Sequence, residues 1–386
     1  MQPSFNDLLD RLEAPNARRV RDYIAAPPPD ADAWPATERM LRQAEAQLRG
    51  AGDRGRQAAA EAAFLHEALA RRGPPWRETA FFLGRAIVLY NRAGDQGAAL
   101  RCHRRLRAAA PADLPPRQAM ALWRPAGVAL SYAASGHAAE ALDSTAALAA
   151  AVAQWSVWER FQLHMLRGRL RLELGEASLA EDEGRLFTAW ATALAPDDPA
   201  LHLGNVSPDG AVDFDIHSDA GRWYCVCELF ALIVVRARIA AGRAPGAALD
   251  ELQGHLDAYD AGWRAAREGA AADERLGPTA EDFRKGVGAA CGFAGWVACE
   301  ARDYERCIRL LDRQEETLGA LYAEGPLYRA AAEAASGRTA QALETLASVD
   351  VQQTRDGRAR AFVGKHGEFD PLRGEAAFAT LTKDWR

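Results

Sequence analysis

The fold class follows from residues 83–111, which read LGRAIVLYNRAGDQGAALRCHRRLRAAAP. Apolar residues recur at spacings of four and three from Leu83 to Tyr90, so they share one face of a helix. Gly94 interrupts the pattern, because glycine accepts the left-handed backbone that ends many helices. A second helical pattern follows and stops at Pro111. The stretch therefore predicts two helices that pack as a hairpin.

The composition favours helices along the whole chain. Alanine is abundant among the 386 residues, whereas the β-branched residues are sparse. Charged residues make up 26%, and the net charge of -6 carries no basic excess. We therefore expect an all-α protein and no nucleic-acid partner.

Comparable hairpins recur along the sequence. Turn glycines stand at positions 52, 94, 136, 175, 242 and 337, and Arg302 replaces glycine at the remaining turn. The paired helical patterns around these turns predict about seven hairpins. They cover 34–72, 83–111, 123–152, 161–190, 225–259, 287–318 and 327–346.

These hairpins resemble the tetratricopeptide-repeat family. The matching residues in the second hairpin are Tyr90, Gly94, Asp95, Ala99 and Pro111. Two positions depart from the family pattern: Ile87 replaces a glycine, and His103 replaces an aromatic residue. The turns also lie farther apart than the family's repeat of about 34 residues, as in degenerate bacterial members. The resemblance implies a right-handed superhelical solenoid.

The resemblance also implies an array with capped ends. Residues 1–33 predict an N-terminal capping helix and a Pro-rich linker, and residues 351–386 predict a C-terminal capping segment. The array itself would span 34–350, with insertions near 196–222 and 262–286. The second insertion is polar and Gly-rich, which predicts an exposed loop or a short extra helix.

The first insertion carries a short β-like alternation. Its apolar members are Val212, Phe214 and Ile216, and the polar residues between them are Asp213, Asp215 and His217. One interpretation is a carboxylate and imidazole metal site. The other is a short solvated strand whose apolar face packs on the helices, and this is the one we adopt. We therefore expect no metal.

Other motifs do not indicate a cofactor. Gly286, Gly288 and Gly292 superficially resemble a dinucleotide-binding loop, but no strand precedes them and the third glycine is misplaced. We expect Gly288, Gly292 and Gly295 to let two helices pack closely instead. The sequence contains no P-loop, HExxH, GxSxG or CxxC motif. The six cysteines do not form a disulfide framework. We expect neither a cofactor nor catalysis.

The resemblance places a binding surface on the first helix of each hairpin. The implied inward residues are Phe81, Val88, Asn91, Trp123, Leu130, Met165, Arg169, Arg236 and Trp296. Such a groove would be apolar and aromatic with arginines, although any one of these side chains could instead belong to the core. The expected function is protein binding without catalysis, as in an adaptor, a chaperone or an immunity-type protein. The alternative is an enzyme or a metal-dependent sensor with its site in 196–222.

The N-terminal residues predict no secretory signal, because MQPSFNDLLDRL lacks a basic start followed by an apolar run. The longest apolar run, residues 229–235, is too short to cross a bilayer. We therefore expect a cytoplasmic protein without membrane insertion.

Overall fold

The computed structural model describes residues 5–25, 34–49, 55–124, 127–152, 155–195, 198–203, 205–208, 212–213, 219–270, 280–321, 324–349, 358–383 and 385. Its elements confirm the all-α class. Apart from the two-residue strands β1 (Asn205–Val206) and β2 (Val212–Asp213), which pair with each other, every described element is a helix.

The chain divides into two compact units. Unit 1 consists of Met1–Ser144 together with Val206–Ala211, and unit 2 consists of Thr145–Asn205 together with Val212–Arg386. The division falls inside the predicted array of residues 34–350.

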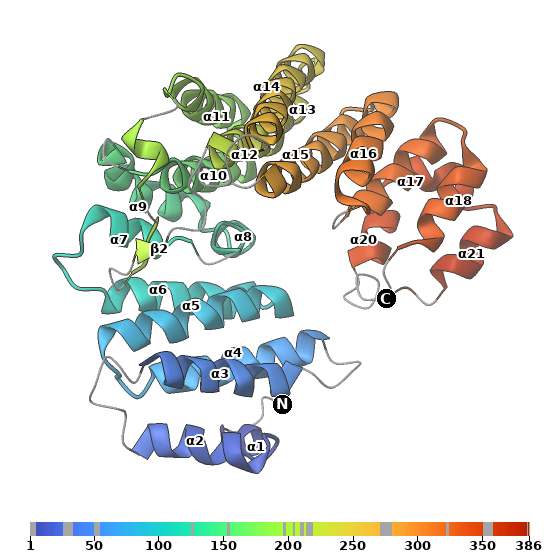
Figure 1. Ribbon diagram of the computed structural model, residues 1–386. Coiled ribbons are helices and arrows are strands. Elements are labelled where there is room, and N and C mark those ends of the chain that lie inside the picture. The colour runs from blue at the N-terminus through green and yellow to red at the C-terminus, as the bar shows by residue number, and fades with distance from the viewer. Residues whose placement is uncertain are drawn as a thin grey trace. The chain divides into compact units, whose positions relative to one another are not determined.

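The described residues of unit 1 form eight complete helices and the start of a ninth. They are α1 (Phe5–Leu9), α2 (Ala14–Ala25), α3 (Trp34–Arg49), α4 (Gly55–Ala70), α5 (Trp76–Ala93), α6 (Gln96–Ala109), α7 (Pro116–Ala121), α8 (Val128–Ala134) and α9 (Ala138–Ala150). From α2 to α6 each helix packs against the next, and the pairs α3/α4 and α5/α6 lie one above the other in Figure 1.

The hairpin formed by α5 and α6 confirms the prediction for residues 83–111. Gly94 adopts φ 80°, and its N–H and that of Asp95 donate to the last carbonyls of α5. The Asp95 side chain accepts a hydrogen bond from the N–H of Ala98 at 2.9 Å and so caps α6. One turn thus ends one helix and begins the next.

Unit 2 contains the remaining helices. They are α10 (Val157–Glu173), α11 (Ala177–Thr192), η3 (Pro199–Leu201), α12 (Asp219–Leu229), η4 (Phe230–Val235), α13 (Arg236–Ala240), α14 (Gly246–Ala270), α15 (Ala280–Glu300), α16 (Tyr304–Leu318), α17 (Gly325–Ala335), α18 (Thr339–Ala347), α20 (Arg358–Lys365), η5 (Gly367–Leu372) and α21 (Ala376–Thr382).

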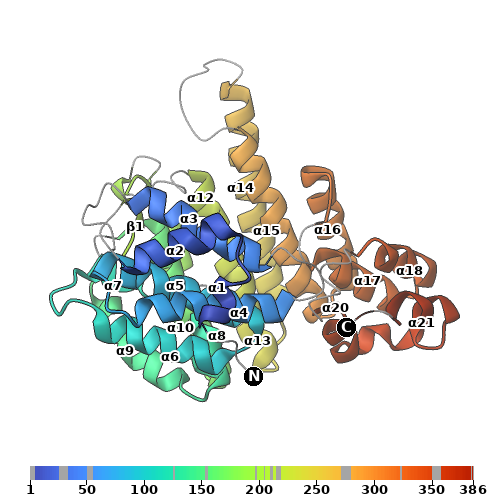
Figure 2. The same ribbon diagram turned by 90° about the horizontal axis from the view of Figure 1, so that it is seen from below.

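The first helices of successive hairpins in unit 2 touch one another. Contacts run from α10 to α12, then to α15, α17 and α20, while α11, α14, α16 and α18 each pack on a first helix. Figure 2 shows α14 and α15 side by side. Helix α14 ends inside the predicted insertion 262–286, and helix α15 begins inside it. The described residues of this insertion therefore belong to two long helices.

Helices α12, η4 and α13 form one continuous rod whose middle segment, η4, is a π-helix. All six side chains of η4, FALIVV, are buried. Helices α10 and α11 approach this segment through glycines: a Cβ on Gly168 would lie 2.6 Å from Ile233, and a Cβ on Gly184 would lie 2.6 Å from Val234. Larger residues there would push the helices apart.

The glycines of α15 allow an equally close approach to α16, as expected for Gly288, Gly292 and Gly295. A Cβ on Gly288 would lie 2.5 Å from Leu318, and one on Gly292 would collide with Gln314. Because each glycine inside a helix costs about 1 kcal/mol relative to alanine, the close packing must offset that cost.

Substitution of Gly168 by alanine should destabilise unit 2. The new methyl group has no room beside the fully buried Ile233, and overpacking of this kind costs about 1–3 kcal/mol. The matched control is Gly254→Ala in α14, where nothing lies within 4 Å and the change should stabilise by about 0.4–1 kcal/mol. Urea unfolding measures both; equal stability of the two variants would contradict the packing described.

Candidate functional site

The π-helical segment sets which side chains of its rod share a face. Glu228 and Arg236 stand eight residues apart, and eight α-helical residues rotate by about 800°, which leaves about 80° between them. The extra residue in a π-turn reduces the effective rotation to about 700°, so the two side chains come within about 20° of one another. The rod therefore presents Glu228 and Arg236 on one side.

Arg236 forms a bidentate ion pair with the last residue of α15. Its Nε donates to Glu300 at 2.8 Å and its terminal nitrogen donates at 2.6 Å. The Tyr328 hydroxyl, from α17, donates to the same carboxylate at 2.8 Å. Burial and then the Glu300 charge raise the pKa of Tyr328, so this hydroxyl stays protonated and acts as a donor. Three consecutive hairpins thus meet at one carboxylate.

Aromatic rings continue the contact from Tyr328. Its ring stacks on Trp296 with a centroid distance of 5.6 Å and an interplanar angle of 14°. Trp296 meets Phe293 edge to face at 5.1 Å, and Phe293 in turn meets Tyr224 of α12 at 6.2 Å. These geometries are the preferred ones for aromatic pairs.

Two further charges complete the site. Burial raises the pKa of Glu228, and a hydrogen bond from Tyr224 and the charge of Arg169 offset only part of that effect. Arg169, on α10, is exposed, yet the surrounding protein reduces its hydration and lowers its pKa, against the influence of Glu228. The Arg169 guanidinium makes neither a hydrogen bond nor an ion pair with any described residue.

These side chains, which we call the Arg236 cluster, are joined in sequence by contacts from Arg236 to Glu228, and Arg169 is linked to Glu228 by charge alone. Its members are Arg169, Tyr224, Glu228, Arg236, Phe293, Trp296, Glu300 and Tyr328. Besides the exposed Arg169 guanidinium, a buried polar atom of the cluster also has no hydrogen-bond partner among the described residues, the indole Nε1 of Trp296. A buried indole N–H usually has an acceptor, so this donor is an exception within the cluster.

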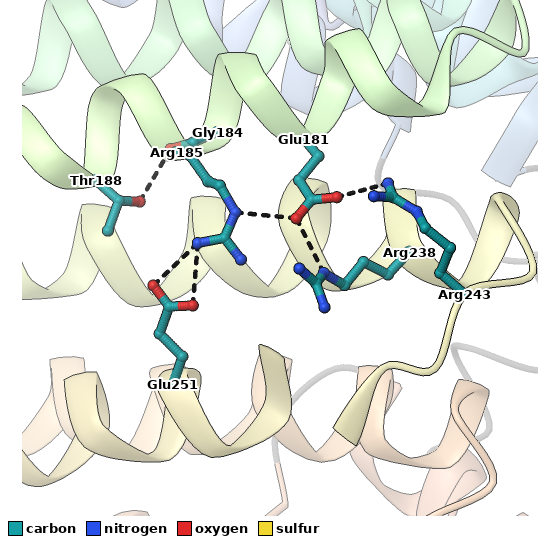
Figure 3. Close-up of polar contacts among 7 residues, drawn as sticks. All are labelled: Glu181, Gly184, Arg185, Thr188, Arg238, Arg243 and Glu251. Atoms are coloured by element: carbon teal, nitrogen blue, oxygen red, sulfur yellow. Dashed lines mark hydrogen bonds and ion pairs between the residues drawn. The ribbon is translucent and has the colours of Figure 1, made fainter. Parts of the chain in front are cut away.

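A second set of ion pairs fixes the rotation of α13. Arg238 stands two residues after Arg236 and so points about 200° away around the helix. Figure 3 shows Arg238, Arg185 and Arg243 directed at the buried carboxylate of Glu181, at 2.9, 2.9 and 2.6 Å. Arg185 also pairs with Glu251 of α14 at 3.0 Å. Ion pairs on both sides of α13 therefore hold Arg236 toward Glu300.

The structure brings three of the sequence-predicted residues together. Arg169, Arg236 and Trp296 all belong to the Arg236 cluster, from three different hairpins. Met165, one turn before Arg169, is 8% exposed and belongs to the core of unit 2.

The other predicted residues lie in unit 1. Phe81 and Val88 are half-buried on α5, and Asn91 on the same helix accepts a hydrogen bond from the Ser131 hydroxyl at 2.8 Å. Leu130, on α8, is 52% exposed. These four residues lie outside the Arg236 cluster, whose members all belong to unit 2.

Trp123 does not sit on a first helix, in contrast to the expectation. It lies in the turn after α7, is 6% exposed, and its ring packs 4.6 Å from His103 and 5.5 Å from Tyr132. The Arg107 guanidinium covers its ring at 4.9 Å. The proline-rich stretch before it starts a short helix, α7, that ends before the tryptophan, so Trp123 serves the core.

Sequence reasoning did not identify five members of the cluster: Tyr224, Glu228, Phe293, Glu300 and Tyr328. A signal was present, because Tyr224/Glu228 and Trp296/Glu300 are spaced four apart and therefore share helix faces. The pairing between hairpins had no such local signal.

Most of the candidate metal ligands in 196–222 lie outside the residues that the structure describes. Asp215 and His217 are not among the described residues, and only the backbone of Asp213 is described. Within the side chains that are described, no three His, Cys, Asp or Glu residues gather as metal ligands would. Among the described helices, none is long and apolar enough to cross a bilayer.

Glu181 and Glu228 should respond to neutralisation with opposite signs. Burial would raise the pKa of Glu181, but hydrogen bonds from Arg185 and Arg238 prevail and lower it, so its ionised form stabilises the fold above its ordinary pKa of 4.5. Glu181→Gln should thus lose about 1–2 kcal/mol at pH 7, with the loss shrinking as pH falls toward 4.

The pKa of Glu228 is raised, so ionisation costs folded-state stability as pH rises through the folded pKa. Glu228→Gln should therefore be at least as stable as wild type at pH 7, and the difference should vanish near pH 4. Urea unfolding between pH 4 and 7 measures both variants. A loss at pH 7 for Glu228→Gln, matching that of Glu181→Gln, would contradict these environments.

No protein-family model matches the sequence, and a search of curated proteins finds no similar chain.

Proposed function

We propose that the chain is a non-catalytic protein-binding protein and that the Arg236 cluster is its contact surface. The supporting observation is the cluster itself: arginines, a tryptophan and a tyrosine from successive first helices occupy one connected surface. Trp, Tyr and Arg dominate binding energy at protein interfaces because they bury large areas or bind carboxylates bidentately.

The chemistry of the cluster defines the partner. Arg169 offers an uncommitted guanidinium, and Trp296 offers an unpaired indole N–H beside stacked aromatic rings. The complementary group is a protein segment that presents an apolar or aromatic side chain next to a carboxylate. The other charged members, Arg236 and Glu300, satisfy each other and act as a fixed frame.

The proposal extends to the architecture. Successive hairpins with left-handed turn residues and touching first helices are what a tetratricopeptide-like superhelix requires. In such an array the first helices form one continuous binding surface. An adaptor, chaperone or immunity-type role uses that surface to hold one partner.

The cysteines do not favour a nucleophilic function. All six are buried and free, as expected from their spacing. Burial raises the pKa of Cys102 to about 12 and that of Cys291 to about 11, so their thiolates are scarce at neutral pH.

Replacing Arg169 by alanine should weaken partner binding without weakening the fold. The side chain makes no hydrogen bond or ion pair among the described residues, so folding loses little, whereas an interface arginine contributes about 2 kcal/mol or more, some 30-fold in affinity. Affinity purification identifies the partner, and calorimetry then compares dissociation constants.

The matched control is Arg309→Ala, an exposed arginine of α16 outside the Arg236 cluster, which should bind as wild type does. Thermal unfolding of all three proteins separates binding from stability. A folded Arg169→Ala protein with unchanged affinity would show that the partner uses another surface.

The alternative function, a metal-dependent enzyme or sensor with its site in 196–222, makes a separate prediction. We expect protein purified without chelators to contain less than stoichiometric zinc, manganese or calcium by elemental analysis. Stoichiometric metal that is lost on Asp213→Ala or His217→Ala would support the alternative. The control substitution is Asp182→Ala, a carboxylate of α11 outside this insertion.

A further inference from the structure

The turn between α15 and α16 departs from the other hairpin turns. Five of those turns place glycine in the left-handed conformation, at positions 94, 136, 175, 242 and 337. Arg302 adopts φ 62° at the corresponding position, and no other described non-glycine residue has a positive φ. A side chain strains this conformation, and strain of this kind is found most often at functional sites.

The strained residue lines a pocket of unit 2. The pocket has a volume of 530 Å³ and its wall comes from α15–α16, α17, α20 and η5. The polar residues that line it are Arg302, Tyr304, Lys365, His366 and Glu368. It shares no residue with the Arg236 cluster, although the ring of its His366 meets Tyr328 of that cluster edge to face at 6.0 Å.

The charges in this pocket are unbalanced. Glu368 accepts a long hydrogen bond from the Tyr304 hydroxyl at 3.5 Å and lies 3.4 Å from Nδ1 of His366. Neither Arg302 nor Lys365 forms an ion pair or a side-chain hydrogen bond within the described part of the chain. Two basic side chains without an ion-pair partner therefore line the pocket together with one carboxylate, and that carboxylate is engaged by Tyr304 and His366.

We propose that this pocket binds an oxyanion group, a phosphate or a carboxylate, between Arg302 and Lys365. The planar guanidinium of Arg302 binds two oxygens of such a group, and the ammonium of Lys365 adds a point charge. The ring nitrogen of His366 that does not face Glu368 supplies a further hydrogen bond at the wall. The pocket is larger than an inorganic ion, so the oxyanion is the end group of a larger ligand.

Titration calorimetry of the full chain with inorganic phosphate and, separately, with acetate tests the proposal and distinguishes the two sources. Arg302→Gly and Lys365→Gln should each lower the affinity for the anion at least tenfold, and Arg309→Gln should leave that affinity unchanged. Arg302→Gly should also melt at the same or a higher temperature, because glycine is the residue of the other turns.

Binding of phosphate alone, or of acetate alone, identifies the class of oxyanion and supports the proposal. Absence of binding for both anions at millimolar concentration overturns it. So does binding that survives both substitutions, because the anion then sits elsewhere. Anion binding that persists in Arg169→Ala shows that the outcome is independent of the Arg236 cluster.

Discussion

The extra residue in the π-helical segment η4 is the constraint on which unit 2 depends. Without it, Arg236 would point about 80° away from the face that carries Glu228, and its ion pair with Glu300 would have no geometry in which to form. Complete burial of its six side chains offsets the free-energy cost of the unusual hydrogen bonding in this segment. Gly168 and Gly184 make that burial possible by letting two helices lie against it.

From this segment the remaining contacts follow in order. Arg238 and Glu181 lock the rotation of α13 on one side, and Arg236 and Glu300 lock it on the other. Glu300 also accepts a hydrogen bond from the Tyr328 hydroxyl, and the Tyr328 ring stacks on Trp296. The polar and aromatic parts of the cluster are thus connected through Glu300 and Tyr328.

Local features of the fold were predictable from the sequence. Glycine followed by an acidic residue marks a turn because the glycine ends one helix and the carboxylate caps the next, as at Gly94 and Asp95. The glycines of α15 indicated close helix packing. The distances of Arg169, Arg236 and Trp296 from the turns predicted that these residues lie on first helices.

Non-local features were not predictable. The π-turn leaves no clear mark in an apolar run such as FALIVV, because the same letters form a regular helix elsewhere. Burial of Trp123 depends on His103 and Tyr132, which lie in other elements. The partners of Glu300 likewise come from two other hairpins, so only the folded chain reveals the Arg236 cluster.

A double-mutant cycle between Arg236 and Glu300 tests the register of the rod most directly. Unfolding free energies of Arg236→Ala, Glu300→Ala and the double variant give the coupling energy of this one pair. A bidentate pair that is 34% and 21% exposed should show coupling of about 1 kcal/mol. Additive effects, with coupling near zero, would mean that the two side chains do not meet and that the π-helical register does not assemble the surface.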